Sequence, residues 1–222
     1  MSKLNKIKAT GISVIQNLSA PIADIAIRLQ MINPEWGLAI SMGVGLLSVW
    51  KDLAEDTGIE LLEFIEQHKN EFAEEVVKTP EFKAAFLNVW EMHIRESSET
   101  KRERLRNFLL SLGKGKKIKL DLHTKIYTVI EQMTNQEAEI FGHIFRGANR
   151  TQFSRMNLSS TATPGLKDFS EFDLQDAYNS LHAYRLITIA AEPTIGAIMT
   201  VRQITPFGEL FYDFVCESTK EA

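Results

Sequence analysis

The sequence is poor in residues that would define several classes of protein. Its 222 residues include one cysteine, Cys216, which excludes an internal disulfide framework and fits a reducing cytoplasm. Positive charge is not in excess either, because the net charge is −4, so the whole chain is not a polycationic nucleic-acid binder. No low-complexity segment or internal repeat is present. What remains is an ordinary globular composition, long enough for one large domain or two modest ones.

Motifs that would indicate catalysis or cofactor binding are also missing. The five histidines lie far apart, and no HExxH or paired Cys/His spacing predicts a metal site. Gly43-Val44-Gly45 is not followed by the third glycine of a dinucleotide fingerprint, and Gly115-Lys116 is not followed by serine or threonine. No GxSxG motif occurs. We therefore expect no enzyme activity, no catalytic or metal-binding residues and no cofactor.

No apolar run is long enough to cross a membrane. The stretch from Trp36 to Trp50 has no charged residue, but it is shorter than the roughly 20 apolar residues that a membrane span needs. We interpret it as a buried central helix of a helical domain. The alternative is a membrane-inserting hairpin that residues 36–50 form with residues 9–32. The N-terminal residues lack the apolar core of a cleavable signal, so we expect a cytoplasmic location.

Helix signals fill the first half of the chain. Thr57 and Glu60 predict a capping box that opens a helix, and Asn70 predicts the cap of a short helix. Thr79-Pro80 predicts a cap followed by proline at the first helical position of a longer helix. Gly113 is expected to end a further helix as its C-cap. We therefore predict a helical domain over residues 1–113 and a basic connector over residues 114–119.

Charge is segregated along this half. Residues 52–81 are mainly acidic, whereas residues 101–119 are mainly basic. Two interpretations follow from this pattern. The two runs are solvated helix faces that attract each other, in this chain or in a partner copy, or the basic run is a footprint for nucleic acid. We favour the first.

The second half changes character after a further helix over residues 120–133. Thr134 and Glu137 predict a capping box for the next helix, and Asp173 is expected to cap another that runs through Tyr184. Residues 186–189 and 197–201 are rich in β-branched side chains and flank turn residues, which predicts a β-hairpin. Thr205-Pro206 opens a closing helix.

This order of elements resembles a winged-helix domain, over residues of about 120–218. The resemblance implies a mainly α protein: an N-terminal helical domain followed by an α+β winged-helix domain, residues 120–222, with a small β-hairpin. The middle segment, WEMHIRESSETKRERLRNFLLSLGK, is also similar to a helical segment of uncharacterised prokaryotic proteins. That similarity implies a bacterial or archaeal origin and assigns no residues.

Three functions are compatible with this fold. The first is a non-enzymatic interaction or adaptor protein that binds a protein partner or itself. In a winged helix, the second helix of the pair normally enters the major groove of DNA. Here the predicted helix at that position, 173–184, carries Asp173 and Asp176 where contact with DNA needs positive charge, which favours the first function. The second is a DNA-binding regulator, with Asn179 and Gln175 reading bases, and the third is a membrane-active effector using residues 9–50. The residues that we expect to contact a partner or nucleic acid are Arg102, Arg104, Arg106, Lys114, Lys116, Lys117, Arg146, Arg150, Arg155, Gln175 and Asn179.

The apolar periodicity also predicts a core. A side chain that recurs on one helix face or in a β-rich run is expected to be buried. The largest of these are Trp36, Leu46, Trp50, Phe86, Trp90, Ile140, Phe141, Leu181, Ile198 and Phe211.

Overall fold

The computed structural model describes residues 54–116, 118–148, 165–190 and 200–216. The chain divides into two compact units, Met1–His123 and Thr124–Ala222, which are described separately here. The division falls inside a helix, a few residues after the predicted connector at 114–119. The uncharged stretch 36–50, the predicted turn residues 192–196 and core candidate Ile198 lie outside the described residues.

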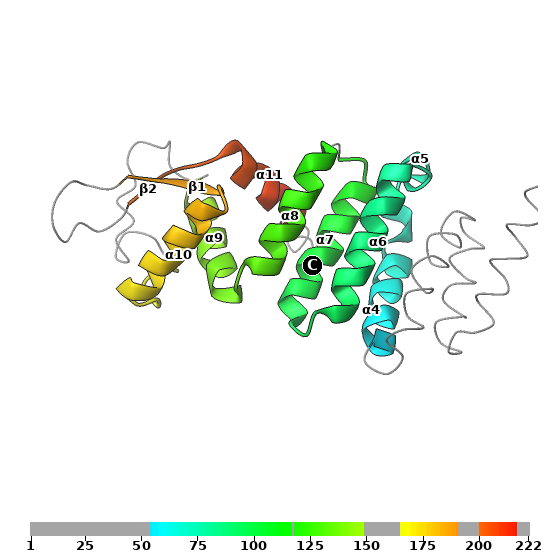
Figure 1. Cartoon of the computed structure of the whole chain (residues 1–222), viewed down its shortest axis with the longest axis horizontal. Helices are drawn as coiled ribbons and strands as arrows, with labels where there is room; N and C mark the ends of the chain where they lie inside the picture. Colours follow the sequence, from blue (N-terminus) through cyan, green and yellow to red (C-terminus); the bar gives the residue numbers. More distant parts are fainter. Residues whose placement is uncertain (1–53, 117, 149–164, 191–199, 217–222) are drawn as a thin grey trace, which may run out of the picture. The chain divides into compact units, whose positions relative to one another are not determined.

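The first unit is built from helices (Figure 1). They are α4 (Ala54–Gln67), a short 3-10 turn η1 (Lys69–Glu71), α5 (Glu74–Val77), α6 (Pro80–Arg95) and α7 (Glu99–Gly113). Helices α4, α6 and α7 pack on one another in pairs. The predicted core residues Phe86 and Trp90 on α6 are fully buried between them, which confirms the apolar face of this helix.

Helix starts in this unit confirm one cap and correct two. Thr79 caps α6 by accepting a hydrogen bond from the Phe82 amide at 3.2 Å, as predicted. The Thr57–Glu60 capping box is wrong, because α4 begins at Ala54 and both residues lie inside the helix. The cap assigned to Asn70 is also wrong. Asn70 lies within η1, and the N-cap of α5 is Ala73, which makes no side-chain cap hydrogen bond.

The end of α7 uses two glycines for different purposes. Gly115 has a φ of +86°, and its amide donates to the Leu112 carbonyl while the Lys116 amide donates to the Ser111 carbonyl. This is the Schellman ending, which needs a residue in the left-handed region and favours glycine there. The prediction of Gly113 as the C-cap is therefore wrong: Lys114 is the C-cap, and Gly115 is the left-handed residue directly after it. Gly113 is the last helical residue, and a Cβ at this position would overlap the ring of Phe72.

The second unit combines helices with a small sheet. Helix α8 (Leu120–Gln132) leads into it and is followed by α9 (Asn135–Ala148), α10 (Glu171–Ala183), β1 (Ile187–Ala190), β2 (Thr200–Ile204) and α11 (Pro206–Val215). The strands pair antiparallel, from Ile187 opposite Ile204 to Ala190 opposite Thr200, with an irregularity after Thr188. Of the predicted second strand, 197–201, the first three residues lie outside the described part and the last two belong to β2.

Local caps in the second unit follow the sequence signals. Thr134 and Glu137 form the predicted reciprocal box at the start of α9, with bonds of 2.7 and 3.1 Å. Thr205 caps α11 by accepting from the Gly208 amide at 2.9 Å, with Pro206 as the first helical residue. The predicted core residues Ile140, Phe141, Leu181 and Phe211 are all fully buried, which confirms the apolar faces of α9, α10 and α11.

The start of α11 is hydrogen-bonded to the two residues that directly precede β1. The Thr205 amide and hydroxyl both donate to the Leu186 carbonyl, at 2.9 and 3.3 Å, and the hydroxyl also donates to the Arg185 carbonyl. Gly208 permits this approach, because a Cβ on it would overlap the Leu186 carbonyl oxygen. We call this contact between 185–186 and 205–208 the latch.

The described part of the chain is mainly helical, with a small two-stranded antiparallel sheet.

Candidate functional site

Helix α10 is held at its start by a capping box that begins earlier than the sequence suggested. Ser170 is the N-cap, and its hydroxyl accepts from the Asp173 amide at 3.1 Å. The Asp173 carboxylate accepts from the Ser170 amide at 3.3 Å, so Asp173 is the third helical residue and not the cap. The reason is local chemistry: Ser-x-x-Asp offers both halves of the reciprocal box, whereas Asp173 alone offers one.

The end of α10 adopts a Schellman ending without glycine. Arg185 has a φ of +62°, its amide donates to the His182 carbonyl, and the Leu186 amide donates to the Leu181 carbonyl. Leu181 and Leu186, the two positions that make the apolar contact of this motif, are both fully buried. An arginine in the left-handed region costs roughly 1–2 kcal/mol, which the surrounding bonds must offset.

One face of α10 is core and the other is exposed. Leu174, Ala177, Tyr178 and Leu181 are buried, as predicted, and the helix packs against α9 and β1. Tyr178 lies deep enough that burial raises the pKa of its hydroxyl to about 12. The packing leaves the opposite side of the helix accessible, which fixes what α10 can present to another molecule.

The exposed side follows helical spacing from the first turn to the last. Phe172, Asp176, Asn179 and Ala183 recur at i, i+4, i+7 and i+11, and all four are exposed. We call these four residues the α10 outer face. Phe172 has 80% of its surface accessible, and it is the single large apolar side chain that is exposed among the described residues.

The first half of α10 is acidic, and His182 is the basic residue of its last turn. The helix carries Glu171, Asp173 and Asp176 and contains no lysine or arginine. Hydrogen bonding to Ser170 lowers the pKa of the Asp173 carboxyl, which therefore stays ionised at neutral pH. Its pKa is lowered further by Gln136. An anionic ligand such as a phosphate backbone would therefore approach α10 against repulsion.

Gln175 and Asn179, the candidates for base reading, are placed differently on this helix. Asn179 lies on the α10 outer face and is exposed. Gln175 is half-buried, and within the described part of the chain its Nε2 is buried without a hydrogen-bond partner. The helix therefore presents one of the two amides to an approaching partner.

The basic residues of the first unit are gathered around acidic ones. Glu60 of α4 accepts from Arg102 Nε of α7 at 3.0 Å and also pairs with Arg106 Nη1. Glu99 of α7 pairs with Arg106 Nη2 at 2.7 Å and with Arg102. We call Glu60, Glu99, Arg102 and Arg106 the ionic cluster. Both arginines are mostly buried, and the Arg106 guanidinium lies 5.7 Å from the centre of the Phe64 ring.

The other basic candidates are scattered. Lys114 pairs with Glu71 at 2.6 Å, and Arg104 is buried. These pairings confirm that the acidic and basic runs of the sequence attract each other within this chain. Lys116 is half-buried at the end of α7. Arg146 on α9 donates to His143 Nδ1 at 3.4 Å. Lys117, Arg150 and Arg155 lie outside the described residues.

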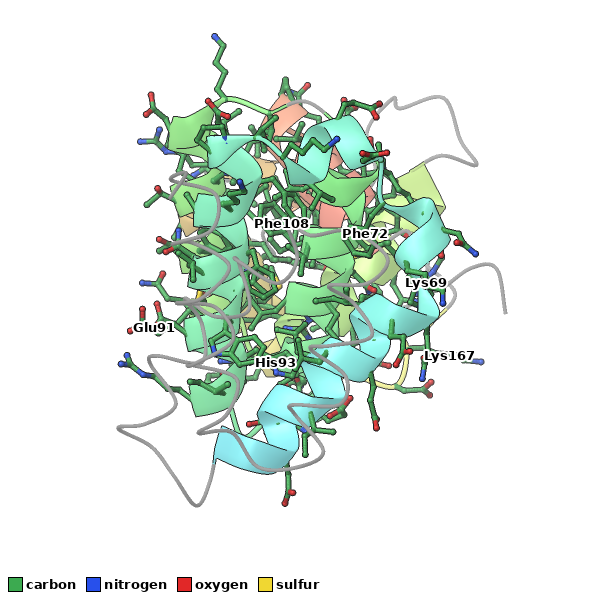
Figure 2. All side chains as sticks on the ribbon, turned by 90° about the vertical axis from the view of Figure 1, so that its right-hand side faces the viewer. Lys69, Phe72, Glu91, His93, Phe108 and Lys167 are labelled. Atoms are coloured by element: carbon green, nitrogen blue, oxygen red, sulfur yellow. The ribbon has the colours of Figure 1, made fainter. Side chains whose placement is uncertain are left out.

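Beside the ionic cluster lies a buried histidine that sequence reasoning did not select. His93 of α6 is fully buried (Figure 2) and its Nε2 lies 3.8 Å from Glu60 Oε1. Glu91, two residues earlier on the same helix, points outward in the same view. Burial, together with the Arg102 charge, lowers the pKa of His93 to about 3, although a hydrogen bond with the Thr57 backbone acts in the opposite direction. His93 is therefore neutral at pH 7, so its contact with Glu60 is not an ion pair.

Two side chains stand out here that the sequence analysis did not identify, Phe172 and His93. A search for the polar side of the helix opposite Leu174 and Leu181 would have found Phe172 as an apolar residue out of place. His93 falls on the apolar side of α6, four residues after Val89 and three after Trp90. Its position in that stripe was the available signal.

Several kinds of site are not found in the part of the chain that the structure covers. No group of three or more His, Cys, Asp or Glu side chains there could hold a metal ion. No described helix is both long and apolar enough to cross a membrane. Comparison of the chain with protein-family models, curated proteins and solved structures finds no match.

Proposed function

We propose that the chain is a non-enzymatic adaptor of a prokaryotic cytoplasm, whose second unit is a winged helix that binds protein through the α10 outer face. The order of elements supports the winged-helix assignment. Helices α8, α9 and α10 precede an antiparallel strand pair, and α11 follows it. This is the order in which a recognition helix is followed by a wing.

The observation that carries the choice of protein over DNA is the chemistry of the α10 outer face. In DNA-binding winged helices the corresponding helix enters the major groove, where Arg, Lys, Asn and Gln read bases. Here that face combines Phe172 with Asp176, and α10 contains no lysine or arginine. Aromatic residues are enriched in protein interfaces and dominate their energetics.

The basic residues of the first unit weaken the DNA alternative further. Arg102 and Arg106 donate to Glu60 and Glu99, and Lys114 pairs with Glu71. Each phosphate contact from these side chains would first have to break an existing ion pair. The net free energy of DNA binding from counterion release would therefore be less favourable than for a surface whose basic residues are unpaired.

Site-specific photo-crosslinking tests the protein-binding proposal. A benzoylphenylalanine that replaces Asn179 on the α10 outer face should give discrete adducts of higher mass in living bacterial cells. The same group in place of Glu75, an exposed residue of α5 in the other unit, serves as the matched control. Equal yields from both positions, or adducts that nuclease treatment removes, would contradict the proposal.

A DNA-binding assay supplies the complementary test. We expect no mobility shift with mixed-sequence duplex DNA at physiological salt, and Asn179→Ala should not change that result. Glu171→Lys combined with Asp176→Lys should increase affinity at low salt, because it removes the repulsion. Tight, sequence-selective binding that Asn179→Ala or Gln175→Ala weakens for one sequence would instead establish the regulator function.

A further inference from the structure

Phe172 has no structural role that accounts for its exposure. It is the second residue of α10, after the Ser170 cap and Glu171. The two positions of a hydrophobic staple around this cap, one before the cap and one at the fourth helical residue, are occupied by Phe169 and Leu174. The cap therefore does not require an aromatic residue at 172, and polar residues are the ordinary choice on an exposed helix face.

Carboxylates surround this ring along the helix. Glu171 is adjacent in sequence, and Asp176 lies one turn further on the same face. Both are exposed, and the ion pairs formed among the described residues do not include either of them. The result is an apolar side chain with acidic groups on two sides, on a helix that has no lysine or arginine.

We propose that Phe172 is the anchor of this interface, and that its occupant is a separate protein that presents a helix whose apolar stripe is bordered by lysine or arginine side chains. The inference rests on the proposed function and specifies the partner for it. An aromatic side chain buries about 150–250 Å² when its pocket closes around it. The basic border would pair with Glu171 and Asp176, supplying orientation and a faster encounter.

The charge on the helix argues against the other occupants. A second copy that met this face through a two-fold axis would bring Asp176 close to its own equivalent, because such an interface uses the same patch twice. Anionic phosphates of DNA or of lipid headgroups would meet the same carboxylates. A single phenylalanine does not offset that repulsion with the wide apolar face that membrane-surface helices use.

The test replaces Phe172 with 4-trifluoromethylphenylalanine in the full chain, which places one fluorine signal at the proposed anchor. The probe ligand is a helical peptide of about 18 residues, five turns, with a leucine stripe flanked by lysines. We expect a saturable change in the fluorine shift. A peptide with glutamate in place of every lysine, and a lysine-leucine peptide whose leucines form no stripe, should each bind at least about tenfold more weakly.

Variants then locate the interaction, with a fluorescently labelled peptide as the reporter. Phe172→Ser, and separately Glu171→Lys with Asp176→Lys, should each weaken binding at least about tenfold without altering the thermal unfolding curve. Glu74→Lys with Glu75→Lys changes the charge of an exposed acidic pair on α5 by the same amount, and should change affinity less than about twofold. An equal effect of the two charge reversals would overturn the inference, because binding would then be non-specific attraction to an acidic protein.

Other outcomes also overturn it. A fluorine shift that changes with protein concentration alone would make the occupant a second copy. A shift produced by anionic vesicles or duplex DNA, and not by the striped basic peptide, would make it a membrane or nucleic acid. Crosslinking from residue 179 that persists unchanged in Phe172→Ser would leave the proposed function in place while refuting Phe172 as its anchor.

Discussion

Acid should destabilise the first unit through His93. This side chain is fully buried, and burial is the largest cause that holds its pKa at about 3. In the unfolded chain a histidine has a pKa of about 6.5. Between these two values the unfolded state binds a proton that the native state does not. Stability is therefore complete above about pH 7 and falls as the pH drops towards 3.

The size of the effect follows from the difference between the two pKa values. Each pKa unit corresponds to about 1.36 kcal/mol. At pH 5 the loss from this one residue is therefore about 2 kcal/mol, and it approaches about 5 kcal/mol near pH 3. The free energy of unfolding of a domain is about 5–15 kcal/mol, so a loss of about 2 kcal/mol at pH 5 would be readily measurable.

The perturbation is His93→Gln, which keeps a polar side chain and removes the titration. Urea unfolding between pH 7.5 and 4.5, followed by hydrogen exchange in α6 peptides, reports on the first unit alone. The parent chain should lose stability over this range, and the variant should lose about 3 kcal/mol less of it. His123→Gln is the matched control, because burial lowers the pKa of that histidine too, but less. Equal slopes for the parent and His93→Gln, or an imidazole NMR signal of His93 that titrates near pH 6.5, would refute the reasoning.

Four further substitutions test three features, each by urea unfolding. Glu60→Gln should cost about 1–3 kcal/mol, because it leaves two mostly buried arginines of the ionic cluster with less compensation; no loss would mean that the pairs contribute nothing. Gly113→Ala should cost about 1–3 kcal/mol through overlap with Phe72, whereas Gly142→Ala, whose new methyl meets only the flexible end of an arginine, should be neutral or stabilising by up to about 1 kcal/mol. Arg185→Gly should stabilise by about 0.5–1 kcal/mol by relieving the left-handed backbone, and a decrease would contradict the strain.

Features decided by adjacent residues could be predicted from the sequence. Thr79, Thr134 and Thr205 could be identified as caps because a threonine hydroxyl at a helix start bonds to the amide three residues later without help from distant residues. The buried faces of α6 and α9 followed from apolar spacing in the same way. Local chemistry determined both, so no knowledge of distant contacts was needed.

Features that depend on distant contacts could not be predicted. Thr57 and Glu60 match the pattern of a capping box, but α4 begins three residues earlier, and Glu60 pairs with arginines more than forty residues away. Arg185 adopts a left-handed backbone conformation, which is unfavourable for arginine. The latch holds the backbone in this conformation through hydrogen bonds to the carbonyls of residues 185 and 186.

Because of the latch, the number of residues between the two strands should not affect the positions of α10 and α11. Its bonds join Leu186, just before β1, to Thr205, just after β2, so the chain between them is a loop closed at its base. Doubling the length of a closed flexible loop costs only about 0.6 kcal/mol in entropy. Residues inserted between the two strands should therefore leave α10 and α11 where they are. The hairpin is accordingly the segment in which this chain could tolerate changes of length, or accept a grafted sequence, without disturbing the helix that we propose binds the partner.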